Sequence, residues 1–474
     1  MNTKALRQKV LDLAIHGKLV PQNPNDESAT VLLEKIRAEK AEKIKKGELK
    51  ADKKDSFIFV GSDKRHYEQF ADGTVKDIED EIPFEVPDGW AWCRLNELAD
   101  IARGGSPRPI ENYITDSPDG INWIKIGDTA PESKYIESAK EKIKPEGQKH
   151  SRFVHEGDFI LTNSMSFGRP YILKINGCIH DGWLVFANIK ECVIKDYLYY
   201  ALSSDYIYAS FSRVAAGSTV KNLKSDTVKQ VLFPLPPIKT QEKIVESIEK
   251  SFTQIDILDN EKLDLQAAIK QAKSKILDLA IHGKLVPQDP NDEPAEELLK
   301  RIATSDNRPY EKVDTSELDW SLQNNWCLCH FGDIATVING KNQSKVENPD
   351  GKYPIYGSGG IMGRADDFIC PANCTIIGRK GSINNPIFVE EKFWNVDTAF
   401  GLCPSEAILP KFLFYFCKYF DFTTLDSSTT LPSLTKTNIQ QIIFALPPIK
   451  EQKRILDKTE ELFGNLDKIV LNLI

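Results

Sequence analysis

The chain contains two copies of the same segments, and this repetition is the strongest constraint on its fold. Residues 9–28 and 275–294 are identical at 17 of 20 positions, with a constant offset of 266. A second pair of segments, Leu-Pro-Pro-Ile-Lys-x-Gln at 235–241 and 446–452, repeats with an offset of 211. Self-similarity of this kind predicts that one structural unit occurs twice.

The two offsets also show where the repeat is interrupted. Carrying the offset of 211 back from Ile474 gives Leu263, and carrying the offset of 266 forward from Met1 gives Ala267. Only three positions of the repeat are missing between these points. We therefore predict a pseudo-two-fold cyclic repeat that is cut open inside one of its own repeated segments. A monomer with approximate two-fold symmetry suits a two-fold partner such as duplex DNA.

The repeated segments predict long amphipathic helices. After Pro236-Pro237, apolar residues recur at spacings of mostly three and four, at Ile244, Ile248, Phe252, Ile255, Leu258, Leu265, Ile269, Ala272, Ile276 and Leu279. Gly283 follows this run, so a helix over roughly 239–282 is expected. The second copy is split between residues 451–474 and the N-terminal stretch. We predict that these two pieces align end to end and pack antiparallel against the central helix.

Segments of mixed helix and strand pattern alternate with the helical ones. Each begins at a tryptophan, Trp90 or Trp326, and strand–turn–strand patterns correspond at an offset of 216, so that Asp181 matches Asp397. The fold class predicted is α+β, or mixed α/β, with two globular domains separated by a pair of long antiparallel coiled-coil helices. The predicted segments are 1–50 (N-terminal helices), 82–235 (first globular domain), 238–302 (long helix plus a short helix), 318–446 (second globular domain) and 448–474 (C-terminal helix).

The order of these segments resembles that of a known family. A globular domain and an LPPIKxQ helix follow one another twice, and the AIHGKLVPQ sequence accompanies both copies. The sequence YGSGGI at 356–361 also resembles a loop in the family's second domain. Over essentially its whole length, the chain resembles the specificity (S) subunits of type I restriction–modification systems.

The resemblance implies a recognition subunit with no chemistry and no cofactor of its own. Each globular domain would be a target-recognition domain that reads one half of a bipartite sequence in double-stranded DNA. The helices would set the spacer and dock two methyltransferase (M) subunits, which bind S-adenosylmethionine and methylate adenine. Two restriction (R) subunits, which use ATP and Mg²⁺ for endonuclease action, are optional partners in such systems.

Candidate DNA contacts are the side chains that suit base edges and phosphates, placed in loops beside glycines. Arginine and lysine read guanine, and asparagine and glutamine read adenine. In the first domain the candidates are Arg103, Arg108, Lys125, Arg152, Asn163, Ser164, Ser166 and Arg169. In the second domain they are Lys341, Asn342, Gln343, Tyr356, Ser358, Arg379, Lys380 and Ser382. The alternative for any one of them is an ordinary surface turn.

The charge of the chain argues against a stand-alone DNA-binding protein. The formal net charge is −8 and the pI is about 5.6, whereas affinity for DNA depends on neutralising phosphates. Residues 83–235 contain 18 basic and 19 acidic side chains, and residues 320–447 contain 10 and 11. We therefore expect weak DNA binding by the chain alone and tight, salt-sensitive binding together with a methyltransferase.

Other functions remain as alternatives. A self-sufficient methyltransferase would need a glycine-rich cofactor loop and an Asn/Asp-Pro-Pro-aromatic motif, and Pro236-Pro237 lacks both flanking residues. A coiled-coil scaffold that binds proteins is favoured by the acidic balance. A third alternative is the specificity subunit of a methyltransferase-only system without a nuclease.

The remaining sequence features predict a cytoplasmic protein without a metal site. No apolar run approaches the roughly 20 residues of a membrane span, and no secretion signal is recognised. The nine cysteines are scattered and odd in number, so free buried thiols are expected. The repeated His16 and His282 lie at predicted helix ends, where a cation favours the helix dipole, and we predict no catalytic role for them.

Overall fold

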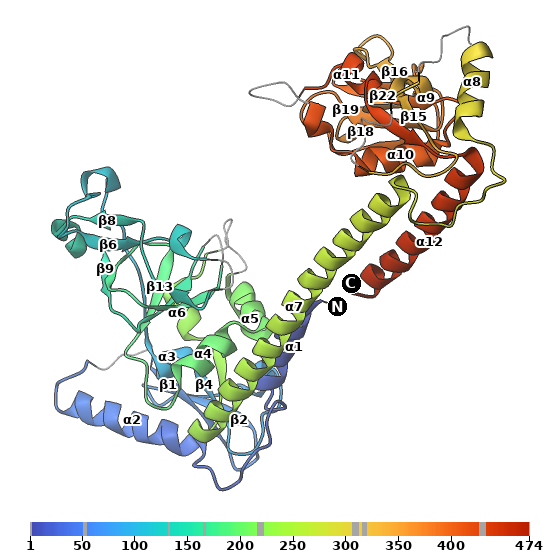
Figure 1. The fold of residues 1–474 in the computed structure, drawn as a ribbon. Helices are drawn as coiled ribbons and strands as arrows, with labels where there is room; N and C mark the ends of the chain where they lie inside the picture. The colour runs from blue at the N-terminus through green and yellow to red at the C-terminus, as the bar shows by residue number, and fades with distance from the viewer. Residues whose placement is uncertain are drawn as a thin grey trace. The chain divides into compact units, whose positions relative to one another are not determined.

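A computed structural model of the chain describes residues 2–50, 55–130, 133–164, 167–215, 222–305, 312–314, 320–425 and 433–473. The chain divides into two compact units, Met1–Asn260 and Glu261–Ile474 (Figure 1). Each unit combines a globular α+β domain with part of the long helix α7 (Ile238–Ile281). The predicted α+β fold with two repeated domains and a long helix is confirmed. No described helix is long and apolar enough to span a bilayer.

The first unit holds the elements from α1 to the first half of α7. Its other helices are α1 (Thr3–Ile15), α2 (Ala29–Lys45), α3 (Leu95–Leu98), α4 (Lys195–Leu202), α5 (Asp205–Ala215) and α6 (Ser225–Lys229). Its strands are β1 (Ser56–Val60), β2 (His66–Phe70), β3 (Val75–Asp77), β4 (Ala91–Arg94), β5 (Asp100–Arg103), β6 (Ile121–Ile124), β7 (Tyr135–Ile136), β8 (Glu141–Ile143), β9 (Arg152–Val154), β10 (Phe159–Thr162), β11 (Pro170–Leu173), β12 (Gly177–Ile179), β13 (Trp183–Ala187) and β14 (Leu232–Leu235).

The second unit repeats this plan with fewer elements. Its helices besides α7 are α8 (Ala295–Ser305), α9 (Phe331–Ile334), α10 (Pro410–Tyr419), α11 (Lys436–Gln440) and α12 (Ile449–Leu473). Its strands are β15 (Cys327–His330), β16 (Ala335–Asn339), β17 (Tyr353–Gly357), β18 (Gly360–Ala365), β19 (Cys374–Gly378), β20 (Ile387–Val389), β21 (Trp394–Asn395), β22 (Ala399–Pro404) and β23 (Ile443–Leu446).

The central sheets of the two domains share the order of four strands, and the first domain adds β7 at one edge. The order is β5-β13-β10-β11-β7 in the first domain and β16-β22-β19-β20 in the second. Ile160 pairs with Val185, and Ile376 pairs with Gly401, so both members of the pair are shifted by the predicted offset of 216. The correspondence between the domains is therefore structural as well as sequential.

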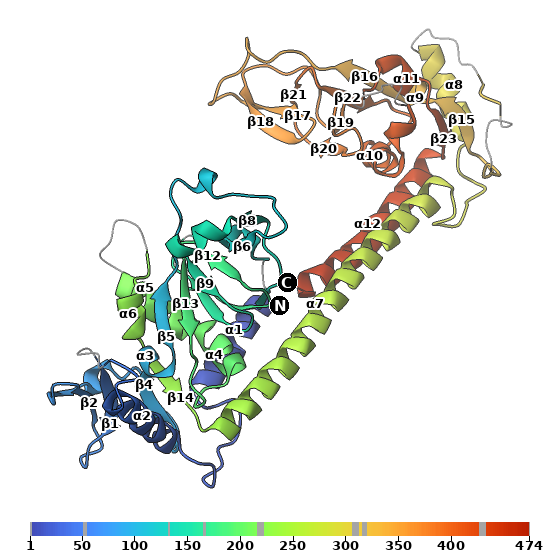
Figure 2. The ribbon, with the colours of Figure 1, turned by 90° about the vertical axis from the view of Figure 1, so that its left-hand side faces the viewer.

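A smaller outer sheet differs between the domains. It has four strands in the first domain, in the order β8-β6-β12-β9, and three in the second, in the order β18-β17-β21. Figure 2 shows β17, β18 and β21 at one end of the second unit, on the opposite side of that domain from α8 and β15. The first unit also carries a meander, β1-β2-β3, whose Glu68 is buried and accepts hydrogen bonds from Arg94 and Ser56.

The long helix packs antiparallel against a different partner helix in each unit. In the first unit the Arg7 guanidinium of α1 lies 4.9 Å from the Phe252 ring centroid and pairs with Asp256. In the second unit Lys273 lies 5.1 Å from the Phe463 ring centroid of α12, and its ammonium pairs with Asp467 at 2.5 Å. A cation, a phenylalanine ring and an aspartate thus recur at the repeat offsets, with arginine in the first unit and lysine in the second.

The predicted apolar seam along α7 is buried at both ends but not in its middle. Ile244, Ile248 and Ile269 are 0–6% exposed, whereas Leu258 and Leu265 are 39% and 37% exposed. The predicted seam is therefore uncovered at these two positions. The spacing of apolar residues shows which face of a helix packs, and it does not show how far along the helix the partner reaches.

A buried glutamine joins each globular domain to its long helix. The Gln241 side chain accepts a hydrogen bond from the Ile194 amide at 2.8 Å and donates to the carbonyls of Cys192 and Pro236. Gln241 is 0% exposed, and so is its counterpart Gln452. The LPPIKxQ motif therefore ends in an amide that satisfies three backbone groups of the domain.

The second unit repeats this joint atom for atom. Gln452 accepts from the Leu409 amide at 2.8 Å and donates to the carbonyls of Ala407 and Pro447. The paired prolines end the preceding strand and begin the helix, because a proline has no amide hydrogen and cannot continue a helix from its N-terminal side. The glutamine then ties the first turn of that helix to the domain surface.

The AIHGKLVPQ segment forms a second joint. Gly17 and Gly283 both have φ of +66° and end the preceding helices. A Cβ atom on Gly17 would lie 2.3 Å from Pro87 Cγ, so the chain passes too close for any other residue. The Gln22 side chain then accepts a hydrogen bond from the Trp90 indole at 2.8 Å. The indole bond differs in the second copy, where Trp326 donates to Glu451. The glutamine amide donates to the carbonyl of the helix-ending glycine in both copies, from Gln22 to Gly17 and from Gln288 to Gly283.

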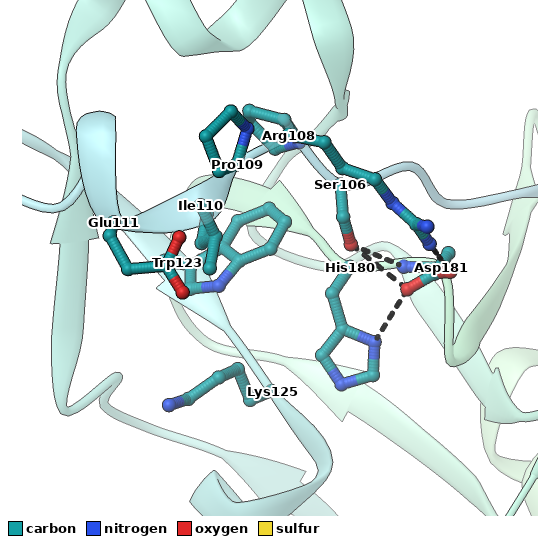
Figure 3. Close-up of a pocket in the computed structure, with 10 residues that line it drawn as sticks. Ser106, Arg108, Pro109, Ile110, Glu111, Trp123, Lys125, His180 and Asp181 are labelled. Carbon is teal, nitrogen blue, oxygen red and sulfur yellow. Dashed lines mark hydrogen bonds and ion pairs between the residues drawn. The ribbon is translucent and has the colours of Figure 1, made fainter.

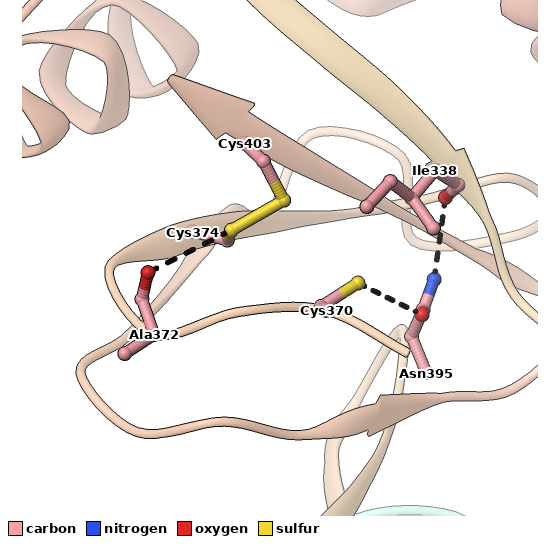
Figure 4. The surroundings of a disulfide bond; sticks show 6 residues. All are labelled: Ile338, Cys370, Ala372, Cys374, Asn395 and Cys403. Atoms are coloured by element: carbon pink, nitrogen blue, oxygen red, sulfur yellow. Dashed lines mark hydrogen bonds between the residues drawn. A yellow bond between two sulfur atoms is a disulfide. The ribbon is translucent and has the colours of Figure 1, made fainter. Parts of the chain in front are cut away.

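The second domain contains one disulfide, between Cys374 and Cys403 (Figure 4). Strands β19 and β22 pair Thr375 with Leu402, so the next pair along the ladder is Cys374 and Cys403, with their Cα atoms 4.6 Å apart. The prediction of free thiols is wrong for these two residues and right for the other seven, which are free and buried.

We predict that the two glutamine joints stabilise their own units independently. Replacing Gln241 with alanine leaves one amide and two carbonyl groups without their partner, which should destabilise the first unit by about 2–4 kcal/mol. Gln452→Ala should affect the second unit by a similar amount. Hydrogen exchange measured by mass spectrometry resolves the two units, and Glu242→Ala and Lys453→Ala are exposed neighbouring controls. Equal loss of protection in both units for either glutamine variant would contradict this prediction.

Candidate nucleic-acid interface

In both domains the candidate residues gather where the first strand of the central sheet leaves the sheet. Gly104 follows β5, and a Cβ atom there would lie 2.2 Å from the carbonyl oxygen of His180. Gly340 follows β16, and a Cβ atom there would lie 1.8 Å from the carbonyl oxygen of Val396. Both glycines are required because the strand end presses against the turn that precedes β13 or β22. The residue after each of these carbonyls is the matched aspartate, Asp181 or Asp397.

Asp181 organises the candidate cations of the first domain (Figure 3). Its carboxylate accepts a hydrogen bond from the Ser106 hydroxyl at 2.9 Å and from the Arg108 guanidinium at 3.2 Å. Its backbone carbonyl accepts from Arg103 at 2.9 Å and from the Asn163 side chain at 2.8 Å. The guanidinium of Arg108 is 78% exposed, so it is held by one contact and still available to a ligand.

The ionisation of Asp181 is set by the same contacts. Partial burial favours the neutral acid, but the Ser106 hydroxyl and the Arg103 guanidinium outweigh it, and the pKa of the carboxyl lies below its usual value. Burial lowers the pKa of the neighbouring His180 imidazole. At neutral pH the cluster therefore contains an ionised carboxylate beside two arginines and a neutral histidine.

Further candidates of the first domain surround an open hollow beside this cluster. The hollow, of about 750 Å³, is lined by Arg108, Lys125, Trp123, His180 and Asp181 among others. Lys125 also pairs with Glu141 of β8. Arg152 donates from its guanidinium to the Arg103 carbonyl at 2.9 Å, which brings it to the same side of the domain. Four of the predicted cations therefore converge on one surface.

The remaining predicted residues of the first domain, Asn163, Ser164, Ser166 and Arg169, are not among the four cations on this surface. Asn163 is 0% exposed and supports the Asp181 backbone, so the prediction that it contacts DNA is wrong. The sequence pattern of a polar residue after an apolar strand does not distinguish a side chain that faces solvent from one that hydrogen-bonds a neighbouring turn. Ser164 is half-buried, Arg169 lies 5.3 Å from the Tyr171 ring centroid, and Ser166 lies outside the described residues.

The candidates of the second domain gather around the equivalent turn. The Lys341 amide donates to the Asn395 carbonyl and the Arg379 amide donates to the Thr398 carbonyl, on either side of Asp397. A Cβ atom on Gly378 would lie 3.1 Å from Ser358 Cβ, which places the β17–β18 turn beside Arg379. Exposed or half-buried in this region are Lys341, Asn342, Gln343, Tyr356, Ser358, Arg379, Lys380 and Ser382.

Sequence reasoning missed several features of these surfaces. Trp123 and His180 line the hollow but follow no recognisable motif, and only the position of Asp181 was matched between the domains. Ile361 and Met362 are exposed on β18, directly after the glycines of the YGSGGI sequence. Neither residue was among the candidate DNA contacts. Among the described residues no group of three or more His, Cys, Asp or Glu side chains could hold a metal ion.

Comparison with known proteins decides the family. A sequence profile described as "Type I restriction modification DNA specificity domain" matches residues 87–267 and 323–471. The chain belongs to this family. The two matches each contain one globular domain and the beginning of the long helix that follows it, which is the unit that the sequence repeats.

Several relatives are similar over most of their length. The chain is 24% identical over 570 aligned residues to the EcoAI type I restriction enzyme specificity subunit from Escherichia coli, covering 98% of this chain and 90% of that protein. It is 28% identical to the EcoEI specificity subunit, also from Escherichia coli, covering 75% and 66% of the two chains.

Solved structures share the fold. The HsdS subunit from Thermoanaerobacter tengcongensis matches with a TM-score of 0.51 at 17% identity, covering 82% of this chain and 92% of that one. A chain from a study of complex assembly and conformational transition of the type I R-M system matches with a TM-score of 0.55 at 18% identity, covering 82% and 94%. At these identities the likeness concerns the fold alone.

We predict that Asp181 restrains non-specific binding by the first domain. In Asp181→Asn one negative charge is lost, so Arg108 loses its ion pair and Arg103 keeps only its bond to the backbone carbonyl of residue 181. Binding to random-sequence duplex should therefore tighten. The salt dependence, d log K/d log[salt], should steepen by about one to two. Fluorescence anisotropy over a salt series measures both quantities. Asp397→Asn is the matched control from the second domain, and an unchanged slope in Asp181→Asn would refute this role.

Proposed function

We propose that the chain is the sequence-reading subunit of a type I restriction–modification complex, with each globular domain reading one half of a bipartite DNA target. The observation that carries this proposal is that the two central sheets share four strands in the same order and present different loops. The paired strands of the shared frame hold the loops, while the candidate residues in those loops differ. Arg103 and Arg108 flank the glycines of the first loop, and Lys341, Asn342 and Gln343 follow the glycine of the second. Two readers of two different half-sites need this combination.

The helices supply the spacing in this proposal. α7 runs without interruption for 44 residues, or about 66 Å at 1.5 Å per residue, and it is stiffened by α1 in the first unit and by α12 in the second. The glutamine joints fix the first domain to the start of α7 and the second domain to the start of α12. Spacer length between the half-sites would therefore depend on the helix rather than on a flexible linker.

The chemistry belongs to partners in this proposal. The specificity family is non-catalytic, and we infer that methyltransferase subunits supply S-adenosylmethionine and adenine methylation, with restriction subunits as further partners that bring ATP and Mg²⁺. The near balance of acidic and basic side chains in each domain supports shared DNA binding, because neither domain alone provides a strong excess of positive charge.

Exposed residues that are identical in both copies are the candidates for docking the methyltransferase. Internal contacts explain the identity of buried positions such as Gln241 and Gln452. They do not explain identity at exposed positions, where two copies of one partner would impose the same side chains twice. These exposed pairs include Lys18 and Lys284, Pro21 and Pro287, Asn25 and Asn291, and Lys239 and Lys450.

The proposed reading function is tested by a base-resolution methylome. Cells that carry the chain with its methyltransferase should show a split, adenine-methylated motif that disappears when only this chain is deleted. Exchanging the loop residues Lys341, Asn342 and Gln343 for alanine should alter one half of the motif and leave the other half unchanged. Survival of every methylated motif after deletion would favour the alternative of a coiled-coil scaffold.

We predict that docking depends on the repeated lysines. Lys18→Glu alone should reduce the stoichiometry from two methyltransferase subunits to one, and Lys18→Glu with Lys284→Glu should remove both. Native mass spectrometry counts the subunits directly. Lys43→Glu is the matched control, because Lys43 is an exposed helical lysine without a repeated counterpart. Retention of both subunits by the double variant would exclude these lysines from the docking surface.

A further inference from the structure

The edge of the outer sheet in the second domain departs from the usual chemistry of sheet edges. Edge strands normally carry charged residues, which discourage pairing with other chains. In the first domain the edge strand β8 follows this rule with Glu141 and Lys142. In the second domain the edge strand β18 exposes Ile361 and Met362, whose side chains are 65% and 62% exposed.

The two edge strands occupy equivalent places, so the difference is specific. β6 pairs in parallel with β12 through Trp123 and Cys178, and β17 pairs in parallel with β21 through Ile355 and Trp394. The second residue of each pair, Cys178 in one and Trp394 in the other, is related to its counterpart by the offset of 216. β8 and β18 are the antiparallel neighbours of β6 and β17. In this register Gly363 and Arg364 take the places of Glu141 and Lys142, and Ile361 and Met362 extend the edge strand toward the β17–β18 turn. In the first domain the residues that precede β8 are Ala139 and Lys140, so the apolar pair has no counterpart there.

A β-bulge presents the two apolar side chains together. Ile355 pairs with Gly363, but the next residue of β17, Tyr356, pairs with Ile361, so Met362 is an extra residue in the edge strand. A bulge interrupts the alternation of side chains and redirects them. It also breaks the regular ladder of the edge, which makes this strand a poor template for pairing with another β-strand.

The bulge lies within the candidate DNA surface. A Cβ atom on Gly357 would lie 2.6 Å from the Met362 sulfur and 3.7 Å from Val396 Cγ2, beside Asp397. The turn between β17 and β18 contacts Gly378 through Ser358, and Arg379 and Lys380 follow Gly378. The neighbouring acids are Asp397 and Glu347, the second of which approaches Gly363.

Resting on the proposed function, we propose that Ile361 and Met362 form an apolar wedge that inserts between base pairs of the half-site read by the second domain. Lys341, Arg379 and Lys380 hold the flanking phosphates, and the two side chains leave water by stacking against the bases. Apolar residues, isoleucine and methionine among them, unstack base steps in this way in other DNA-binding proteins. An unstacked step also lowers the cost of extruding a neighbouring base, which a methyltransferase needs. The first domain, with Ala139 and Lys140 ahead of its edge strand, forms no such wedge.

The experiment uses the complex of the chain with its methyltransferase on duplexes that carry the methylated motif. 2-Aminopurine is placed in turn at each position of both half-sites other than the methylated adenine, so that base extrusion by the methyltransferase does not contribute. Binding should increase fluorescence at one step in one half-site only. Ile361→Ser with Met362→Ser should abolish this increase and weaken specific binding on the order of tenfold, with an unchanged salt slope.

Two control variants separate the wedge from the surrounding charges and from folding. Lys380→Gln should reduce the salt slope by about one and keep the fluorescence increase. Ile361→Val with Met362→Leu keeps the apolar volume and should keep both the increase and the affinity. Loss of the signal in this conservative variant would show that the side chains act through folding and not by insertion.

Three outcomes overturn the wedge. The first is specific binding by the unaltered complex without brightening at any tested step, which leaves the proposed reading function intact. The second is a serine double variant that retains the signal. The third is a serine double variant whose DNA binding is unchanged but whose self-association in sedimentation velocity is reduced, which would assign the patch to contact between copies of the chain. If the unaltered complex binds the motif no better than random duplex, the proposed function itself fails.

Discussion

The buried glutamine at the start of each long helix is the contact on which the arrangement of each unit depends. A helix beginning at a strand end can leave a domain in many directions, because a single peptide link fixes none of them. Gln241 removes this freedom by bonding at once to the Pro236 carbonyl of the corner and to the 192–194 segment of the domain. Gln452 does the same in the second unit. Shortening or removing either amide would leave buried backbone groups without partners, which is costly in an apolar setting.

The repeat in the sequence allowed much of the fold to be predicted, because a constant offset carries register as well as similarity. The offset of 216 also relates the strand pairs of the two domains, because Ile160 pairs with Val185 and Ile376 pairs with Gly401. Predictions about single side chains were less reliable where they depended on which way a residue faces. Asn163 ends a strand and turns inward to support Asp181, and the seam residues Leu258 and Leu265 are exposed where their helical face lacks cover. The disulfide between Cys374 and Cys403 required the register of two strands 29 residues apart, which spacing alone does not give.

The candidate site could be predicted as two regions but not as a set of contacts. Glycine-rich loops beside Arg103 and Lys341 were recognisable because a tight approach of backbones needs glycine, and the structure explains both Gly104 and Gly340 by such an approach. The part played by Asp181 was not recognisable, since an aspartate among cations reads as a surface charge. Ile361 and Met362 were not predicted as DNA contacts for a different reason. Exposed apolar residues are common, and these two become unusual only when β18 is known to be an edge strand.

The acidic balance of the chain and its role in reading DNA are compatible for a structural reason. In the first domain, Asp181 occupies the centre of the cluster and its carboxylate is ionised, so Arg103 and Arg108 are partly neutralised before any DNA arrives. Cations held in this way gain little from random phosphates but still offer directed hydrogen bonds to a base edge in the right place. Such a surface contributes discrimination and leaves most of the phosphate attraction to a partner. Selection for a low affinity of the isolated chain would then favour the carboxylate, because a freely basic surface would bind DNA without regard to sequence.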